Sequence, residues 1–510
     1  MNETPIKVLQ IGSSDWSVQY TIPEQMEWTF AREGEFEQVL VDEKGKKVKA
    51  FDLLIFTDTD YERESFERLI PFATPYSVFY NGLVRNKDAF SKLFLSKQAQ
   101  AIAMDHPQNL IEDFSKTFFV GQEGSKLDPR FLNVFDSFKG KISYEGNAFT
   151  VFEGDFGQEL TPLLTWRYNM ISRINQDLDI WLEYIKDQEL AIELTAFQFA
   201  SGTSDIIRKL SFTETDLENQ ITIPSLEKES YVSFTLKVKG QGQLKLGPLH
   251  QRRSRLGRGQ FIAGGKCLVD DNRQELIAYF SPGDLKPPLN VYFSGYRTAE
   301  GFEGYWMMTN MKAPFVLIGD PRLEGGSFYL GSDALESQVT AFIEEKLDFL
   351  GFKKDQLILS GLSMGTFGAS YYATQLHPHA VIIGKPLFSL GNIAKNGYQM
   401  RPDEFGTAFD MVYGLTNQLS QNSMDQVNHR FWNAVDQSDL SKTLFAMAYM
   451  KHDDYDRTAY YDFLERTKGK NIKVISKGIE GRHNDNSGSI NQWFLNQYKR
   501  IMSLDFGRES

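Results

Sequence analysis

The chain of 510 residues has a single cysteine, Cys267, and only seven histidines. One cysteine cannot form an intramolecular disulfide, and it cannot build a cysteine-based metal site. The scarcity of cysteine fits a reducing cytoplasm, and the sequence predicts no metal site. The small number of histidines also means that few candidates exist for a general base.

The sequence also lacks long apolar runs and an excess of basic residues. No apolar stretch approaches the length that spans a bilayer, and the first residues, MNETPIKVLQIG, lack the basic and apolar regions of a signal peptide. The net charge of −12 argues against general nucleic-acid binding, which requires a basic face. We expect a cytoplasmic protein without a nucleic-acid partner. Peripheral contact with the inner face of the cell membrane stays open.

The patterning predicts an α/β protein with several domains. Residues 1–160 alternate short apolar runs with helical segments, with candidate strands at 6–11, 51–56 and 77–80, which indicates a Rossmann-like α/β domain with a parallel sheet. Residues 161–190 carry apolar side chains at helical spacing after Pro162, which predicts a linker helix. Residues 191–283 contain alternating segments such as 231–239, separated by glycine-rich turns, which predicts a small β-sandwich.

From residue 284 to 510 the β–α alternation returns, and it contains a GxSxG motif, GLSMG, at 361–365. An apolar strand at 356–360 precedes this motif, and a helix to about residue 375 follows it. A nucleophile elbow needs this strand–turn–helix context, with small neighbours that relieve the strain at the serine. Gly361 and Gly365 provide them. The segment therefore predicts an α/β-hydrolase domain with Ser363 as nucleophile.

The remaining members of a triad should follow in the order serine, acid, histidine. His483 lies on the loop between the last predicted strand, 471–476, and the last helix, where a general base is expected. The preceding strand, 443–450, ends in the loop KHDDYD. The sequence favours Asp453, the earliest acid after that strand, and keeps Asp454 as the alternative.

An oxyanion hole requires two backbone N–H groups. We expect one from Met364, directly after the nucleophile, and the other from the loop after an early strand, in the segment NVYFSGYRTAEGF that begins at Asn290, at Tyr296 or, as second choice, Gly295. About sixty residues separate strands 380–384 and 443–450. This insertion, at about 386–440, is expected to form a cap over the site.

Two further patterns carry weaker signals. Asp58 and Asp60 follow a strand as a DxD, which resembles the metal-binding motif of nucleotide-sugar glycosyltransferases but is more often a polar turn. Arginines cluster in the segment HQRRSRLGRGQ, and we expect a solvated hairpin loop or, as the alternative, a contact for an anionic surface or partner. The arginines are Arg252, Arg253, Arg255 and Arg258.

Over its full length the chain resembles the family of second accessory secretory proteins of the Gram-positive accessory Sec system. The segments KVLQIGSSDWSVQY, LILSGLSMGTFGAS and GIEGRHNDNS carry the resemblance. It implies work with two companion accessory secretory proteins and a SecA-type motor in the export of serine-rich-repeat glycoprotein adhesins. It also implies O-acetylation of the adhesin's sugars, chiefly N-acetylglucosamine, through Ser363, His483 and an acid at Asp453 or its neighbour. The resemblance further implies that the sandwich binds carbohydrate.

The leading hypothesis is therefore a serine-dependent O-acetyltransferase coupled to adhesin export. No bound cofactor is expected, but an acetyl donor is required, and acetyl-CoA is taken as the candidate donor. One alternative is an esterase or deacetylase with the same triad. The other is a largely non-catalytic scaffold of the export complex.

Overall fold

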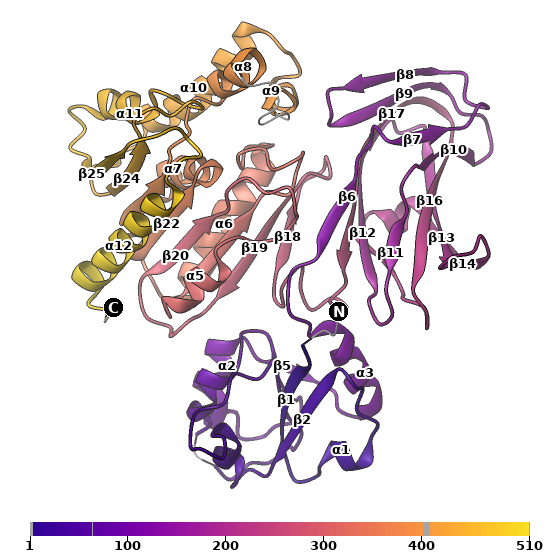
Figure 1. Cartoon of the computed structure of the whole chain (residues 1–510), viewed down its shortest axis with the longest axis vertical. Helices are drawn as coiled ribbons and strands as arrows, with labels where there is room; N and C mark the ends of the chain where they lie inside the picture. Colours follow the sequence, from indigo (N-terminus) through magenta and orange to yellow (C-terminus); the bar gives the residue numbers. More distant parts are fainter. Residues whose placement is uncertain (1–3, 64, 401–407, 509–510) are drawn as a thin grey trace.

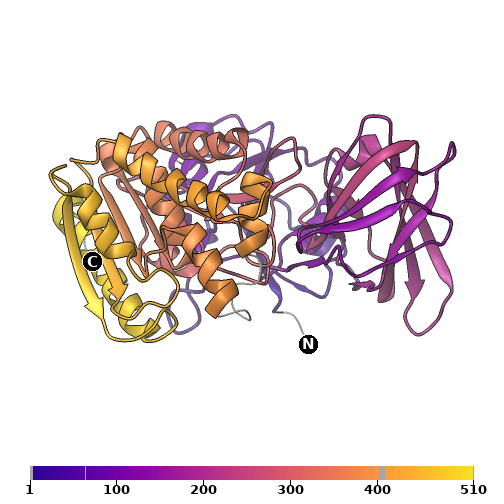
Figure 2. The same ribbon diagram turned by 90° about the horizontal axis from the view of Figure 1, so that it is seen from above.

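The computed structural model describes residues 4–63, 65–400 and 408–508, which divide into three bodies with separate sheets. Figure 1 shows the N-terminal domain below, with the β-sandwich and the C-terminal domain side by side above it. Figure 2, seen from above, separates the sandwich from the helices of the C-terminal domain. The predicted α/β class, with a sandwich between two α/β domains, is confirmed.

The N-terminal domain is a five-stranded, wholly parallel sheet in the order β2-β1-β3-β4-β5. Its central strands are short apolar runs buried on both faces, which is the pattern of a parallel sheet covered by helices. The strands are β1 Ile6–Ile11, β2 Met26–Ala31, β3 Leu53–Phe56, β4 Val78–Asn81 and β5 Gln100–Ile102, and the helices are α1 Trp16–Gln19, α2 Ser91–Lys97 and α3 Pro107–Thr117. The domain ends after α3, earlier than the predicted boundary at 160.

The sandwich extends from β6 to β17 and packs two antiparallel six-stranded sheets over one apolar core. One sheet has the order β14-β13-β16-β10-β7, with β11 beside β16, and the other has the order β15-β12-β17-β9-β8, with β6 beside β17. The elements are β6 Gly124–Leu127, β7 Leu132–Val134, β8 Lys141–Glu145, β9 Phe149–Asp155, β10 Thr161–Trp166, β11 Met170–Ser172, β12 Leu178–Lys186, β13 Ala191–Ala200, β14 Ile206–Thr213, α4 Glu214–Leu217, β15 Ile221–Ile223, β16 Ser230–Lys239 and β17 Gln241–Arg253.

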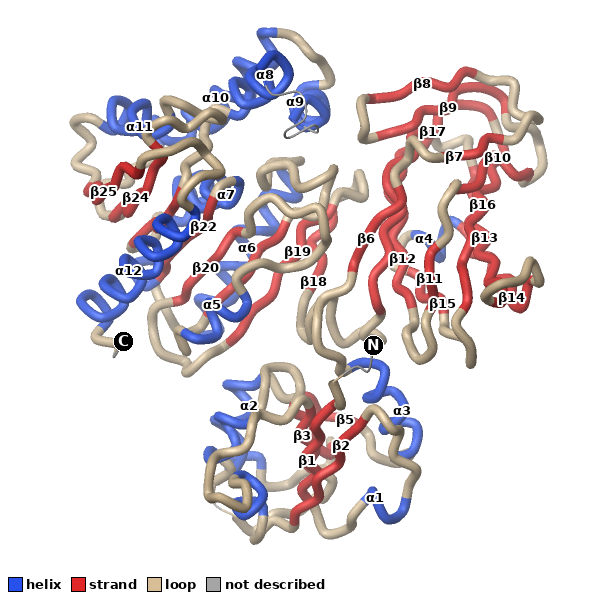
Figure 3. The backbone as a smooth tube through the Cα atoms, in the orientation of Figure 1, coloured by secondary structure: helices blue, strands red, loops and turns tan. Residues whose placement is uncertain are grey.

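The linker helix predicted at 161–190 is wrong, because this segment forms β10, β11 and β12, drawn as strands in Figure 3. Pro162 lies in β10 beside a register shift, a place where a strand tolerates proline. The apolar residues with helical spacing do not share a buried face, since Ile171 and Ile174 are 45 % and 52 % exposed. Packing of β12 against β17 determines the structure here.

The C-terminal domain has an eight-stranded sheet in the order β18-β19-β21-β20-β22-β23-β24-β25. The two N-terminal strands, β18 and β19, pair antiparallel, and the other six run parallel to one another. Because β18 and β19 belong to this sheet, the sandwich ends before β18 and not at the predicted residue 283. The strands are β18 Lys266–Val269, β19 Glu275–Ser281, β20 Leu289–Phe293, β21 Phe315–Gly319, β22 Leu357–Leu362, β23 Ala380–Gly384, β24 Leu444–Met450 and β25 Lys473–Ile479, and the packing helices are α5 Tyr305–Asn310, α6 Asp333–Leu350, α7 Met364–Leu376, α11 Ala459–Thr467 and α12 Ser487–Phe506.

Three helices occupy the predicted cap insertion between β23 and β24: α8 Leu390–Met400, α9 Ala408–Thr416 and α10 Gln421–Gln437. Residues 401–407, which belong to the predicted cap, lie outside the described residues. Helix α10 packs against α8, α9 and α7, and Figure 1 shows these cap helices at the top of the C-terminal domain, with α9 nearest the sandwich.

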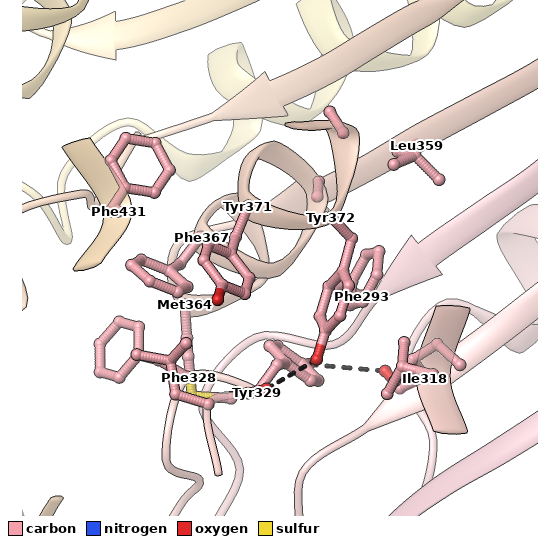
Figure 4. Packing of buried hydrophobic residues seen from close by; sticks show 14 of the residues in the cluster. Phe293, Ile318, Phe328, Tyr329, Leu359, Met364, Phe367, Tyr371, Tyr372 and Phe431 are labelled. Carbon is pink, nitrogen blue, oxygen red and sulfur yellow. Dashed lines mark hydrogen bonds between the residues drawn. The ribbon is translucent and has the colours of Figure 1, made fainter. Parts of the chain in front are cut away.

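The core under the elbow includes large aromatic side chains around α7, packed with aliphatic ones (Figure 4). The rings of Phe293 and Tyr372 stack at 5.6 Å between centroids, and the Tyr372 hydroxyl donates to the carbonyl of Tyr329 at 2.9 Å. These contacts fix α7, and therefore the serine at its start, against β20 and the loop after β21. Within the described part of the chain, no helix combines the length and apolar character needed to cross a bilayer.

Candidate active site

Ser363 stands at the turn between β22 and α7, with φ 52° and ψ −120°. A residue with a side chain pays about 1–3 kcal/mol for such a conformation, so the surrounding contacts must hold it. The Ser363 N–H donates to the carbonyl of Gly384 at 2.9 Å. A Cβ on Gly361 would lie 2.3 Å from the carbonyl oxygen of Gly365, and a Cβ on Gly365 would lie 2.1 Å from that of Phe293. Both glycines are therefore required by close backbone approach.

The structure brings Ser363, His483 and Asp453 together from three separate loops. The Ser363 Oγ lies 2.8 Å from His483 Nε2, and His483 Nδ1 lies 2.8 Å from Asp453 Oδ2. The imidazole and the carboxylate are buried, at 1 % and 5 % exposure. Water is thereby kept from the histidine–acid pair, which strengthens the interaction between them.

Asp454, the alternative acid, has a different position. Its Oδ1 accepts the backbone N–H of His483 at 3.0 Å, so it holds the main chain of the histidine loop instead of facing the ring. The ring of Tyr455 stacks on the imidazole at 4.3 Å. Asp453 Oδ1 accepts the backbone N–H of Tyr455 at 2.9 Å, which orients the carboxylate toward His483.

Asp456, the last acid of the same loop, connects this loop to the first residues of the cap insertion. Its Oδ2 accepts the backbone N–H groups of Phe388 and Ser389, each at 2.8 Å. Burial raises the pKa of Asp456 to about 6, although these hydrogen bonds act in the opposite direction. The three acids of the HDDYD segment thus hold the imidazole, the histidine loop and the start of the cap.

The expected oxyanion-hole donors occupy unequal environments. The Met364 N–H is the first of α7, and the first N–H groups of a helix have no intrahelical acceptor. The Gly295 N–H donates to Glu303 Oε2 at 2.7 Å and is therefore engaged. The ring of Tyr296 packs on Gly325 and the side chain of Met364 packs on Gly326, where a Cβ would lie only 2.0 Å and 2.6 Å from these side chains.

Two residues near the site have no motif that could have identified them from the sequence. Glu303 binds the Gly295 N–H from eight residues away, and its own N–H donates to Ser294 Oγ at 3.1 Å. Lys385 follows β23 with φ 62° and donates to Ser487 Oγ at 2.9 Å. Burial lowers the pKa of Lys385, while the nearby carboxylate of Asp453 acts to raise it.

The DxD residues take partners from within the N-terminal domain. Asp58 Oδ1 accepts the Ser13 hydroxyl at 3.0 Å, and Asp60 Oδ2 pairs with Arg85 Nη1 at 3.1 Å. Among residues 4–63, 65–400 and 408–508 no group of three or more histidine, cysteine, aspartate or glutamate side chains is arranged to hold a metal ion.

The arginine cluster is not a solvated loop or an exposed anionic contact, so that prediction is wrong. Arg252 and Arg253 end β17, and both are buried, as is Arg255. The Arg255 guanidinium donates to the carbonyls of Thr117, Phe119, Gly121 and Phe261. Arg258 lies over the rings of Phe79 and Phe114. Apart from Phe261, the partners named here are carbonyls and rings more than 100 residues away in the sequence, so local composition could not reveal them.

The arrangement on the elbow suits nucleophilic acyl chemistry. A hydroxyl in contact with an imidazole, whose other nitrogen faces a buried carboxylate, can lose its proton as it attacks a carbonyl carbon. Backbone N–H groups at the start of α7 can then stabilise the negative oxygen that develops. The three side chains follow the order serine, aspartate, histidine along the chain, as α/β-hydrolases do.

Comparison with protein families matches residues 6–508 to a family described as the accessory Sec system GspB-transporter. Two curated relatives, both accessory Sec system proteins, are each 39 % identical. The one from Streptococcus gordonii aligns over 99 % of this chain and 99 % of its own length, and the one from Staphylococcus aureus over 98 % and 97 %.

Among solved structures, a chain of the Glycosylation Associate Protein (Gap123) complex from Streptococcus agalactiae is similar over its full length and that of this chain. The TM-score is 0.93 and the identity is 39 %. The arrangement of all three bodies, and not of the C-terminal domain alone, is therefore shared with that protein.

Proposed function

Because the chain belongs to the accessory Sec system GspB-transporter family, we propose that it is a serine-dependent O-acetyltransferase that modifies sugars of an exported glycoprotein. The observation that carries the proposal is the Ser363–His483–Asp453 array on a strained elbow, with 2.8 Å between each pair of facing atoms. N-acetylglucosamine of serine-rich-repeat adhesins is the proposed acceptor, and acetyl-CoA is the proposed donor.

In the first half-reaction, Ser363 Oγ attacks the acetyl carbonyl carbon while His483 Nε2 takes the hydroxyl proton. Asp453 holds the Nδ1–H tautomer and stabilises the imidazolium. We assign the Met364 and Tyr296 N–H groups to the oxyanion, since the Gly295 N–H already donates to Glu303. The leaving thiol takes the proton from His483, which leaves an acetyl ester on Ser363.

In the second half-reaction, a sugar hydroxyl replaces the donor. His483 takes the proton of this hydroxyl as its oxygen attacks the acetyl ester, and returns a proton to Ser363 Oγ when the ester bond breaks. The sugar gains one acetyl group and the serine is restored. Transfer dominates over hydrolysis only if the sugar outcompetes water, which is a role for the cap.

A cavity with mixed polar and apolar lining, between the sandwich and the C-terminal domain, is the proposed acceptor site. It has a volume of about 420 Å3 and includes Asp270, Gln274, Arg322 and Tyr413 in its lining. Groups of this kind suit sugar hydroxyls and the face of a sugar ring. Leu323 and Ser327 of the same lining flank in sequence the two glycines that contact the side chains of Tyr296 and Met364, which supports an acceptor site near the proposed oxyanion hole.

The test is to incubate the purified protein with acetyl-CoA and an N-acetylglucosamine-bearing glycopeptide and to measure intact mass. We expect a gain of acetyl groups with the natural chain and none with Ser363→Ala or His483→Ala. Loss of acetyl groups from a pre-acetylated glycopeptide, without any gain, would show an esterase instead. Unchanged mass in both directions, with export intact in a Ser363→Ala strain, would favour the scaffold role.

We propose that the two companion accessory secretory proteins, the SecA-type motor and the adhesin are its partners, in the cytoplasm or at the inner face of the membrane. Similarity over the full length to a chain from a glycosylation-associated complex supports companion proteins. Co-purification of tagged natural chain and Ser363→Ala with these partners tests it. Equal recovery of both would show that assembly is independent of catalysis.

A further inference from the structure

The loop of residues 294–304, between β20 and α5, is called the oxyanion loop here because it carries the Tyr296 N–H. Its two ends are tied to each other, since Gly295 donates to Glu303 and Glu303 donates to Ser294. These bonds set the local shape of the loop. They do not fix it to the rest of the molecule, so other groups must hold it in place.

The sandwich supplies two of these groups from β17. His250 Nδ1 bonds Glu300 Oε1 in the middle of the oxyanion loop, and Arg252 Nε donates to Glu300 Oε2 at 3.1 Å. All three side chains are buried, at 0 %, 2 % and 4 % exposure. Strand β17 of the sandwich therefore binds the oxyanion loop of the C-terminal domain through the buried carboxylate of Glu300.

The two basic side chains are themselves anchored on both flanks. His250 Nε2 lies 2.7 Å from Glu183 Oε1 on β12, and Arg252 Nη1 donates to Glu275 Oε2 at 3.1 Å on β19. Burial alone would lower the pKa of His250, but Glu300 and Glu183 raise it to about 9. His250 is thus a cation at neutral pH and can donate to both carboxylates.

The segment that leads into the sandwich adds a neutral contact to the same loop. Gln122 Nε2 donates to the carbonyl of Phe302 at 3.0 Å, and the Phe302 N–H donates to Gln122 Oε1 at 2.6 Å. The side-chain amide of Gln122 thereby satisfies both the N–H and the carbonyl of Phe302, as a neighbouring β-strand would. With Glu300 and Phe302 held from outside, the loop cannot shift without breaking a buried ion pair.

We propose that His250, Arg252 and Gln122 are positioning residues for the reaction, through which docking of the sandwich sets the oxyanion loop and completes the oxyanion hole. This inference rests on the proposed function of Ser363. It assigns the sandwich a role in the rate of acyl transfer itself, separate from any binding of sugar.

The experiment compares His250→Gln, Arg252→Lys and Gln122→Ala with Leu249→Ala in the full-length protein. Leu249 is a fully buried core residue on the same strand, so its truncation destabilises the sandwich without removing a contact to the loop. Two readouts are taken: hydrogen–deuterium exchange of peptides covering residues 294–304, and Ser363-dependent hydrolysis of p-nitrophenyl acetate.

We expect faster exchange of the loop and a 10- to 100-fold fall in kcat, with KM within about twofold, in the three positioning variants. Leu249→Ala should lower the melting temperature while leaving loop exchange and kcat near those of the natural chain. Gln122→Ala removes no buried charge, so the inference can still be tested with this variant if His250→Gln or Arg252→Lys fails to fold.

Unchanged loop exchange in the positioning variants would overturn the inference, as would an equal fall in kcat for Leu249→Ala. Faster exchange with unchanged kcat would overturn its catalytic part. A natural-chain rate equal to that of Ser363→Ala would instead overturn the proposed function, and the exchange readout would then decide separately whether the sandwich holds the loop.

Discussion

At the scale of residues, the site depends on how His483 is held. Four neighbours fix its ring and its main chain: the hydroxyl of Ser363, the carboxylates of Asp453 and Asp454, and the stacked ring of Tyr455. Only one of the two acids faces the ring. Replacement of Asp453 should therefore lower kcat far more than replacement of Asp454.

We expect Asp453→Asn to lower kcat for acyl transfer by about 10³- to 10⁴-fold, since the amide disfavours the needed tautomer and cannot stabilise the imidazolium. Asp454→Asn is the matched control and should cost about tenfold or less, because it retains an oxygen for the His483 N–H. Steady-state hydrolysis of p-nitrophenyl acetate measures both. A larger loss in Asp454→Asn would reverse the assignment of the acid.

The pKa of His250 predicts a pH dependence of stability. It is raised from 6.5 to about 9 in the folded protein, so its contribution is fully present below pH 6.5 and is lost as the pH rises through about 9. The shift corresponds to roughly 3 kcal/mol. The carboxylates that act on His250 are Glu300, Glu183 and Glu275, and the cations beside Glu300 are Arg252 and Lys126.

The measurement is the melting temperature between pH 6 and pH 9.5 for the natural chain and His250→Gln. The natural chain should lose more stability over this range than the variant, which cannot release a proton at this position. Parallel curves for the two proteins would contradict the prediction.

Residues with a local signal could be predicted from the sequence, and residues without one could not. Ser363 lies in a motif with the right flanking elements, and His483 and an acid of the KHDDYD loop follow from chain order and loop position. Glu300 and Glu303 lie in a loop of mixed composition, and the partners of Glu300 are 48 to 50 residues away. Which acid faced the ring also depended on geometry that a run of two adjacent aspartates does not encode.

At the scale of elements, strands of the parallel sheets were predictable and the strands at 161–190 were not. The parallel strands are continuous apolar runs with turns after them. The segment that forms β10 to β12 has apolar residues at a spacing that also fits a helix. Its pairing with distant strands, as of β12 with β17 at separations of 58 to 75 residues, overrides that local pattern.

The carboxylate of Asp410 links the cap to the sandwich. Asp410 on α9 accepts the backbone N–H and the side-chain amide of Asn147, both at 2.9 Å, at the turn after β8. Gly146 in that turn has φ 56°, and a Cβ there would lie 1.8 Å from the carboxylate. This contact therefore links the position of α9 to that of the sandwich.

We expect Asp410→Ala to raise the ratio of hydrolysis to transfer several-fold, because a looser cap admits water to the acetyl-enzyme. The ratio is measured as free acetate against acetylated glycopeptide. Asp425→Ala is the control, since this acid pairs with Gln421 within α10. An unchanged ratio in Asp410→Ala, or an equal change in Asp425→Ala, would contradict a role for this contact.

At the scale of the whole molecule, the sandwich and the C-terminal domain share a buried set of charges and should unfold together. We expect one urea transition by tryptophan fluorescence, since Trp166 and Trp181 report the sandwich and Trp432 and Trp493 the C-terminal domain. Breaking a buried ion pair costs about 3–5 kcal/mol, so His250→Gln should separate two transitions. A single transition in the variant at the natural midpoint would show that the cluster does not couple the domains.

The number and class of the domains could be predicted from the sequence, but their boundaries and contacts could not. The domain contacts include buried arginines and carboxylates, residue types that are usually found on the surface. Their burial follows from partners that only the folded chain brings together.

The single cysteine of the chain lies at this same junction. Cys267 is half-buried; its Sγ accepts from Arg252 Nη1 at 3.4 Å, and desolvation together with the Glu275 carboxylate raises the pKa of its thiol. Little thiolate therefore exists at neutral pH, and a disulfide reagent should react slowly with the native protein. Any partner or variant that draws β17 away from β18 would accelerate that reaction. The natural chain thus offers one chemical reporter, without engineering, for the moment at which its domains separate.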